Sequence, residues 1–141
     1  AQTSDPDIVA AGDCTMHKNS RLGVRHRLES VQNAVDQAKI AAATLLGEVK
    51  PYEQIPWFWS DQFDAKLQMV GTSAKHDTMV LRGTTAQSAF SCFYFRGDEL
   101  IGVDSVNRPA DHMVSRKLIA AGAKVPHELI TDLSENLKSL L

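Results

Sequence analysis

The sequence predicts an α+β protein, with one long helix in its first third, antiparallel strands in the middle and helices at the end. Three observations predict this class. Apolar residues recur at helical spacing between Ser30 and Leu46. Four short runs rich in β-branched and aromatic residues follow between positions 66 and 106, bounded by glycine or turn residues. Helical spacing returns after Pro109. Strands and helices are therefore largely segregated along the chain, which is typical of α+β proteins.

The composition bounds the possible functions. The chain has 141 residues, 43% of them hydrophobic, which is one domain by length with enough apolar residues for a core. The formal net charge is -2, so the chain lacks the excess of positive charge that is typical of nucleic-acid-binding proteins, and we expect no nucleic-acid partner. No apolar run approaches the roughly 20 residues of a membrane span, so we expect no membrane partner. Cys14 and Cys92 form neither a CxxC motif nor a disulfide framework, which indicates a cytoplasmic protein.

The first apolar run is Pro6 to Ala11, which we expect to be a short buried strand closed by Gly12 and Asp13. Glycine allows a ligand to approach the backbone, and the aspartate offers two acceptor oxygens. The pair is therefore a plausible ligand-binding edge, although a plain turn explains the same residues.

The next segment, Thr15 to Arg27, is polar, and we expect most of it to be a solvated loop. His17 and His26 lie too far apart for helical metal-ligand spacing, and no cysteine or carboxylate joins them in a zinc pattern. No metal site is predicted.

The clearest element is a helix from Ser30 to Leu46. Ser30 is a good N-cap, and Gly47 stands where a left-handed C-terminal cap belongs. The free N–H groups and positive dipole at its amino end would suit a partner with negative charge. Eight residues form one apolar stripe: Val31, Ala34, Val35, Ala38, Ala41, Ala42, Leu45 and Leu46.

An aromatic segment from Ile55 to Gln62 holds both tryptophans of the chain. Pro56 favours an extended entry, so Trp57 and Trp59 should share one face, opposite Phe58. Two interpretations stay open here. The segment is either a buried strand or a wall for a flat conjugated ligand.

The later elements follow from pattern and turn residues. Strands are expected at 66–70, 78–82, 90–95 and 100–106, with a hairpin turn over 96–99. Both faces of the third of these strands carry large side chains: Phe90, Cys92 and Tyr94 on one face, Phe93 and Phe95 on the other. We therefore expect both faces to be covered, by helices or by another domain.

A second helix is expected from Asn107, as its cap, to Gly122, with Pro109 in its first turn. Its apolar face comprises Met113, Val114, Leu118 and Ala121. A short helical piece follows, with Leu129, Ile130 and Leu133, before a leucine-containing tail.

Three segments occur in a specific order: Gly12-Asp13-Cys14, Arg27 to Ala34 and Pro56 to Gln62. In this order they resemble the carboxyl-terminal third of FAD-dependent NAD(P)H ferredoxin reductases of the putidaredoxin, rhodocoxin and biphenyl-dioxygenase reductase type. The likeness continues to Pro109 and covers nearly the whole chain. It implies that residues 1–50 are the carboxyl-terminal segment of the FAD-binding domain, a Rossmann-like remnant of last strand plus long helix. Residues 51–141 are then the small domain that covers the flavin and docks the ferredoxin.

The resemblance also implies roles for single residues. Asp13 would contact the ribityl and phosphate region of FAD, and the Val31 backbone N–H would meet the pyrimidine side of the flavin ring. Trp59 would lie near the flavin edge where electrons leave, with Trp57 as a packing residue. The partner, a two-iron ferredoxin, is acidic in such systems, so Lys39 is the candidate docking residue with Arg25 and Arg27 behind it. No catalytic residue is assigned.

The implied parent enzyme passes a hydride from NADH or NADPH to FAD, and then single electrons to a ferredoxin that serves an oxygenase. No G-x-G-x-x-G motif occurs in the chain, so the pyrophosphate fingerprints for FAD and NAD are absent. We therefore expect the chain alone to be inactive, to require the rest of the reductase chain, and to be able to form a homodimer. The alternative is a non-catalytic docking or dimerisation module that uses the segment from Trp57 to Trp59.

Overall fold

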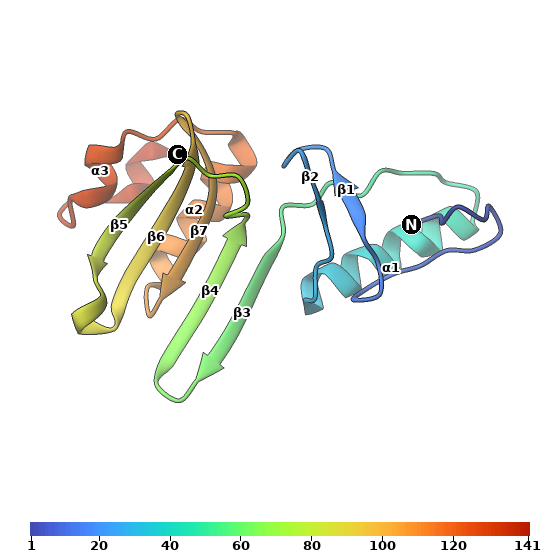
Figure 1. Ribbon diagram of the computed structural model, residues 1–141, viewed down its shortest axis with the longest axis horizontal. Helices are drawn as coiled ribbons and strands as arrows, with labels where there is room; N and C mark the ends of the chain where they lie inside the picture. Colours follow the sequence, from blue (N-terminus) through green and yellow to red (C-terminus); the bar gives the residue numbers. More distant parts are fainter. The chain divides into compact units, whose positions relative to one another are not determined.

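A computed structural model describes residues 1–141, which form two compact units, 1–56 and 57–141. The first unit holds a two-stranded sheet and the long helix, and the second holds a five-stranded antiparallel sheet with shorter helices (Figure 1). The predicted α+β class is confirmed.

The first unit contains a hairpin where the sequence predicts a solvated loop. β1 (His17–Asn19) pairs antiparallel with β2 (Val24–His26). The fully buried Asn19 side chain stabilises the turn, because it accepts a hydrogen bond from the Leu22 N–H at 3.2 Å. It also donates to the Gln54 carbonyl at 2.9 Å. The expected loop is wrong for the backbone, which forms a hairpin, whereas the cations Lys18, Arg21, Arg25 and Arg27 are exposed as expected.

The expected buried strand over Pro6 to Ala11 is not formed within residues 1–141. The segment makes one isolated bridge, Gln2 to Val9, and the Ile8 side chain is 52% exposed. A strand requires a neighbour to pair its backbone groups, and within residues 1–141 this segment has only that single bridge.

The long helix is confirmed as α1 (Val31–Leu45). The Ser30 side chain accepts from the Asn33 N–H at 3.1 Å, and Gly47 follows the last turn at a φ of +86°. The buried face of α1 differs from the predicted apolar stripe. The buried residues are Gln32, Asn33, Gln37 and Ala41, whereas Val31, Val35, Ala38, Ala42, Leu45 and Leu46 are exposed. Most of the predicted apolar stripe therefore has no cover within residues 1–141.

The second unit is built on a sheet with the strand order β3-β4-β7-β6-β5, all antiparallel. The Gly97-Asp98 turn between β6 and β7 confirms the predicted hairpin. The bounds are β3 (Trp57–Gln62), β4 (Ala65–Gly71), β5 (Thr78–Thr84), β6 (Ala89–Arg96) and β7 (Glu99–Val106), with a 3₁₀ turn at Thr85–Gln87.

Helices cover one face of this sheet. α2 (Pro109–Ala121) packs on β7 and β4, and α3 (His127–Thr131) packs on β5, so both lie on the same side of the sheet (Figure 1). Phe93 and Phe95 are fully buried under them with Val103. A final 3₁₀ turn, Leu137–Leu140, buries Leu137.

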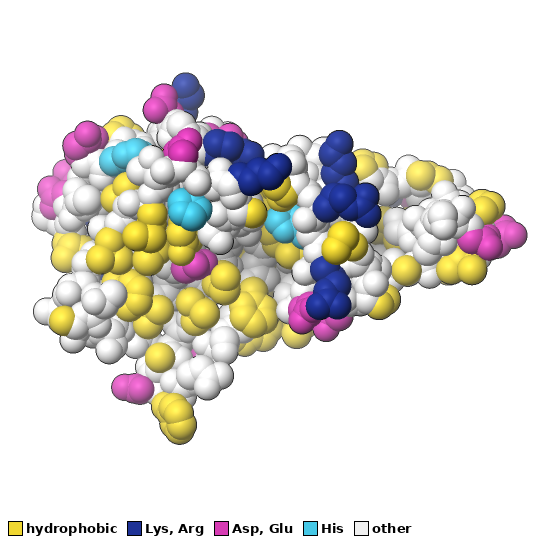
Figure 2. Space-filling model, in the orientation of Figure 1, with side chains coloured by type: hydrophobic (Ala, Val, Ile, Leu, Met, Phe, Trp, Pro, Cys, Tyr) yellow, Lys and Arg dark blue, Asp and Glu magenta, His cyan; other side chains and the backbone are white.

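The helices cover only one face of the sheet, and the expected cover of the opposite face by another domain stays a prediction. Strand pairing aligns one side chain from each strand into a row across this opposite face: Phe58, Met69, Asp104, Cys92 and Leu81. Phe58 and Leu81 are each 38% exposed. Hydrophobic side chains gather over the sheet in the space-filling view (Figure 2).

Two details of α2 differ from the sequence prediction. Arg108, and not Asn107, is the N-cap. Asn107 has a φ of +52° and uses its side chain elsewhere, accepting from the Lys66 N–H and donating to the Ser88 carbonyl. Met113 is 54% exposed and Ala121 is also exposed, so the buried face turns towards His112, Ser115 and Ile119. The predicted end of the helix at Gly122, which has a φ of +62°, is confirmed.

No helix in the structure is both long and apolar enough to cross a membrane.

Candidate functional site

A tight turn presents Asp13 at the surface of the first unit. The Thr15 N–H donates to the Gly12 carbonyl at 3.0 Å, so Asp13 occupies the corner of the turn with its side chain exposed. Gly12 has a φ of +84°, a left-handed conformation that disfavours other residues. The turn therefore offers a solvent-facing carboxylate on a constrained backbone.

This turn lies against the first part of α1. A methyl group added at Gly12 would stand 3.7 Å from the Ala34 Cβ, one helical turn beyond Val31. Because the first N–H groups of a helix have no partner within it, the Val31 N–H is a donor at the positive end of the dipole. The structure thus brings the turn of Asp13 close to the helix start at Val31. The site thus combines an exposed carboxylate on this turn with backbone donors at the start of the helix that the turn contacts.

A half-buried cluster of His17, His26 and Tyr52 escaped the sequence analysis. The hairpin sets His17 opposite His26, and the His17 ring contacts the Tyr52 ring at 4.9 Å between centroids. Burial lowers the pKa of both histidines, and the neighbouring His26 and the chain's amino group lower that of His17 further. Burial and the nearby Asp36 raise the pKa of Tyr52 to about 12. The glycine at position 23 between two short alternating runs was the available signal for the hairpin.

The three predicted docking cations are exposed and have separate partners. Lys39 pairs with Asp36 at 3.2 Å, and Arg27 pairs with Glu29 at 2.5 Å. Arg25 donates to the Met16 carbonyl at 3.4 Å. Arg25 stands beside Lys18 in the hairpin register, which adds a cation that the sequence analysis did not single out.

Trp59 lies in the second unit, on β3. It is 40% exposed and stacks on Trp57 with 5.5 Å between ring centroids and 26° between planes. The two rings therefore share one face of the strand, as predicted. Trp59 also lines a cleft of about 460 Å³ together with Asp61, Lys66, Gln68, Asn107 and Pro109.

Trp57 connects this aromatic pair to α2. The Arg116 guanidinium lies 4.6 Å from its ring centroid, and His112 lies 6.4 Å away. Burial and the Arg116 charge lower the pKa of His112, which is only 1% exposed. Trp57 thus packs on a helix, while Trp59 offers the more exposed ring.

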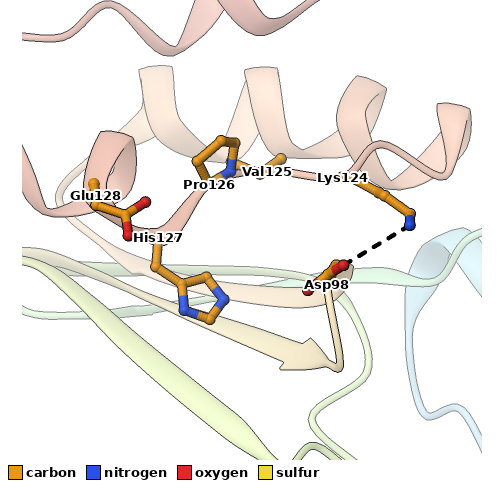
Figure 3. Close-up of a pocket in the computed structure, with 6 residues that line it drawn as sticks. All are labelled: Asp98, Lys124, Val125, Pro126, His127 and Glu128. Atoms are coloured by element: carbon orange, nitrogen blue, oxygen red, sulfur yellow. Dashed lines mark ion pairs between the residues drawn. The ribbon is translucent and has the colours of Figure 1, made fainter.

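A second cavity of about 330 Å³ lies at the β6–β7 turn, where Lys124 reaches towards Asp98 at 3.8 Å (Figure 3). Both side chains are about four-fifths exposed, and such a pair in water contributes little to stability. Val125, Pro126, His127 and Glu128 form the rest of its wall. We assign this cavity no chemistry, because its charges are solvated and a backbone bridge from Glu99 to Lys124 accounts for its shape.

The structure contains no cluster of three or more histidine, cysteine or acidic side chains arranged for a metal ion. Both cysteines are free thiols, with Cys14 exposed and Cys92 half-buried.

Comparison with known proteins places these observations in a family. A family model described as Reductase C-terminal matches residues 57–141. Rhodocoxin reductase of Rhodococcus erythropolis is 46% identical over 137 residues, which are 97% of this chain and 32% of that protein. Among solved structures, a ferredoxin reductase from Rhodopseudomonas palustris superposes with a TM-score of 0.89 at 50% identity, over 98% of this chain and 34% of that one.

The covalent putidaredoxin reductase–putidaredoxin complex gives a TM-score of 0.90 at 44% identity, over 99% of this chain and 33% of that chain. The chain thus spans about a third of the length of the relatives it matches. These matches confirm the resemblance that the segments around Asp13, Val31 and Trp59 indicate. The chain belongs to the reductase C-terminal family, and nearly all of it is homologous to one third of ferredoxin reductases of the rhodocoxin and putidaredoxin kind.

Proposed function

We propose that this chain is the carboxyl-terminal part of an NAD(P)H:ferredoxin reductase. In the whole enzyme FAD takes a hydride from NADH or NADPH and passes single electrons to a two-iron ferredoxin that serves an oxygenase. Residues 1–50 complete the FAD-binding domain, and residues 51–141 cover the flavin and dock the ferredoxin. The observation that supports this proposal is the packing of Gly12, next to Asp13, on Ala34 in the first turn of α1.

Asp13 and Val31 are the proposed flavin ligands. The exposed Asp13 carboxylate accepts hydrogen bonds from hydroxyl groups of the ribityl chain. The Val31 N–H donates to the pyrimidine edge of the ring, where the helix dipole favours the negative charge of the reduced cofactor. Together they hold one side of the ligand, whereas a cofactor site normally buries most of its ligand surface. The remaining contacts belong to the rest of the reductase.

The rest of the reductase chain also explains the exposed face of α1. Val35 is 48% exposed and Leu45 is 70% exposed, and with Ala38 and Ala42 they form one continuous stripe. A stripe of small and apolar residues suits close packing on a sheet. We propose that this sheet is the Rossmann-like sheet of the FAD-binding domain, and that Pro6 to Ala11 becomes its last strand there.

Ferredoxin docking is proposed for the exposed cations and for Trp59. The similar putidaredoxin reductase forms a covalent complex with putidaredoxin, which supports a partner of the same class here. Lys39 is 71% exposed, and Arg25 is also exposed beside Lys18, so these groups can meet an acidic partner at little cost in desolvation. Trp59 offers a half-exposed indole beside Lys66 in the same cleft.

Expression of the whole gene product tests the proposal. The purified protein should carry FAD, visible as flavin absorbance, and should reduce a two-iron ferredoxin with NADH or NADPH. A protein without flavin absorbance, even after addition of FAD, would contradict it.

The exposed stripe on α1 favours one alternative, a docking or dimerisation module without a cofactor. Exposed apolar patches of this kind commonly mark protein interfaces. The alternative predicts a colourless whole gene product whose partner binding is lost when Trp59 is changed, so the same absorbance measurement separates the two functions. A homodimer of the 141-residue chain through α1 is compatible with either. We also propose a cytoplasmic location, which the two free thiols support.

A further inference from the structure

The side chain of Gln37 joins α1 to the turn that carries Asp13. Gln37 is 4% exposed, and its Oε1 lies 2.8 Å from the Gly12 nitrogen and 2.8 Å from Thr15 Oγ1. A backbone N–H can only donate, so the oxygen of the Gln37 amide must face Gly12. The orientation of this buried amide is therefore set by its partners.

The other end of the same amide reaches the histidine hairpin. Gln37 Nε2 lies 3.0 Å from His17 Nδ1. Because Nε2 can only donate, His17 Nδ1 must accept, and the ring is neutral with its proton on Nε2. Burial lowers the pKa of His17, which favours this neutral form. Gln37 is thus held at both ends of its amide, because a flipped amide would set its Nε2 donor against the Gly12 N–H and its oxygen against the acceptor His17 Nδ1.

The Gln37 side chain contacts both ends of the turn. Gly12 is the first residue and Thr15 the last, and the Thr15 hydroxyl also lies 2.8 Å from the Gly12 carbonyl. Asp13 stands between them, with no freedom to move its backbone unless one of these contacts opens. The backbone position from which the exposed Asp13 side chain projects therefore depends on the Gln37 amide.

We propose that Gln37 is a positioning residue for the flavin, which acts by holding the turn from Gly12 to Thr15 so that Asp13 points at the cofactor. This inference rests on the proposed role of Asp13 as a flavin ligand. Gln37 itself touches no cofactor. It adds to the site a residue from the middle of α1 that the segments of the family resemblance did not identify.

The first test uses the whole reductase and measures hydrogen exchange, so it needs no activity readout. Gln37→Met keeps the side chain's length and removes both polar atoms. Hydrogen exchange of the Gly12 amide, followed by NMR, should be at least about tenfold faster in this variant, because the amide loses its acceptor. Gln32→Met is the matched control, since it removes the same amide from the same helix but its contacts are with Asp36 and Tyr52. Unchanged Gly12 exchange in Gln37→Met would overturn the inference.

The second test uses the whole reductase and the dissociation constant of FAD. Gln37→Met should weaken FAD binding about tenfold, the equivalent of about 1.4 kcal/mol. Asp13→Asn should weaken it too, and the double variant should be no weaker than Asp13→Asn alone, because Gln37 acts only through Asp13. Additive losses would mean that Gln37 supports the fold in general and would overturn the inference.

The outcomes also separate this inference from the proposed function. A wild-type protein that binds no FAD removes the proposed function. A wild-type protein that binds FAD, with full affinity in Gln37→Met, removes only the inference. Should Gln37→Met fail to fold, Thr15→Val removes one of the two donors to Oε1, and the same non-additivity with Asp13→Asn is expected.

Discussion

Trp59 illustrates how a single residue combines exposure with a fixed orientation. Its ring is 40% exposed, yet it stacks on Trp57, which is held in turn by Arg116. Such an indole offers a rigid surface to a partner at a small entropy cost. Its neighbour Phe58 points to the opposite face of the sheet, opposite Met69 on β4, and so provides a natural control.

We predict that Trp59→Ala in the whole reductase slows electron transfer to ferredoxin more than it slows flavin reduction by the nicotinamide. The reason is that Trp59 is proposed to lie at the electron exit, away from the nicotinamide side. Stopped-flow measurement of the two half-reactions checks this. Phe58→Ala, on the other face of the same strand, should not produce this selective loss. Equal losses in both half-reactions for Trp59→Ala would indicate a general disturbance of the flavin pocket instead.

Lys39 is the second residue with a specific expectation. Lys39→Glu in the whole reductase should raise the ferredoxin KM and flatten its salt dependence, because a cation facing an acidic partner becomes an anion. Reduction of ferricyanide should be unchanged. Steady-state kinetics at several ionic strengths provide the measurement. Lys50→Glu is the control, since Lys50 is also exposed and paired, with Glu48 at 2.5 Å. Unchanged ferredoxin kinetics at low salt would remove Lys39 from the docking surface.

At the scale of elements, Arg82 on β5 fastens the carboxyl-terminal segment to the sheet. Its side chain is 4% exposed and donates to the carbonyls of Ile130 at 2.9 Å, Asp132 at 2.5 Å and Glu135 at 2.8 Å. Its Nε lies 3.5 Å from the Asp111 carboxylate of α2, which Arg108 also binds at 2.6 Å. One guanidinium thus links β5, α2 and the segment after α3.

Arg82→Met should therefore destabilise the second unit by about 3–5 kcal/mol, the usual cost of removing one partner from a buried charged network. It removes the Arg82 donor from the Ile130 and Glu135 carbonyls, whereas the Asp132 carbonyl keeps the Glu135 N–H, and it leaves the buried Asp111 with one cation fewer. Urea unfolding followed by tryptophan fluorescence reports on this unit alone, because both tryptophans lie in it. Lys117→Met on the exposed side of α2 should change stability by less than about 0.5 kcal/mol. Similar losses in the two variants would show that the network contributes little.

At the scale of the whole molecule, buried groups make stability depend on pH. Burial lowers the pKa of His112 below its unfolded value of 6.5, so the folded state binds fewer protons than the unfolded state. The stability that neutral His112 permits is present above pH 6.5 and is lost as the pH falls towards its folded pKa. Burial raises the pKa of Asp104, whose contribution has the opposite sign: it is lost as the pH rises through the folded pKa.

We predict that the second unit unfolds at lower urea concentration at pH 5.5 than at pH 7.5, and that His112→Leu reduces this difference. The leucine fills a similar volume and cannot be charged. Tryptophan fluorescence in urea at both pH values is the measurement. A variant with the same acid sensitivity as the wild type would assign that sensitivity to other groups.

The 141-residue chain by itself should be colourless and inactive. Asp13 and Val31 are proposed to contact only one side of the FAD. The exposed stripe of α1 should associate with another chain and give a dimer, or leave the first unit loosened. Residues from about Pro51 onward should fold alone, since the second unit has its own buried core around Phe93 and Ile130. Absorbance after addition of FAD, together with sedimentation, checks both points. A compact monomer that retains stoichiometric FAD would contradict the prediction and reveal a complete site.

The sequence by itself determined the elements and the family. Helical spacing and the caps Ser30 and Gly47 defined α1, and alternation with turn glycines defined four strands and a hairpin, because these signals are local. The ordered segments around Asp13, Val31 and Trp59 identified the ferredoxin reductase family, because short motifs in a fixed order can be recognised without knowing how the chain packs. The roles of these residues remain predictions.

Only the tertiary structure decided which surfaces are covered and which side chains meet. Periodicity marked the stripe of α1 as apolar, but coverage depends on a partner surface, and within these residues the helix buries Gln37 and leaves Val35 exposed. The same holds for the open face of the five-stranded sheet. The contacts of Gln37 with Gly12 and His17 join positions 25 and 20 residues apart. No local pattern predicts such pairs, because they form only when a turn, a hairpin and a helix pack together.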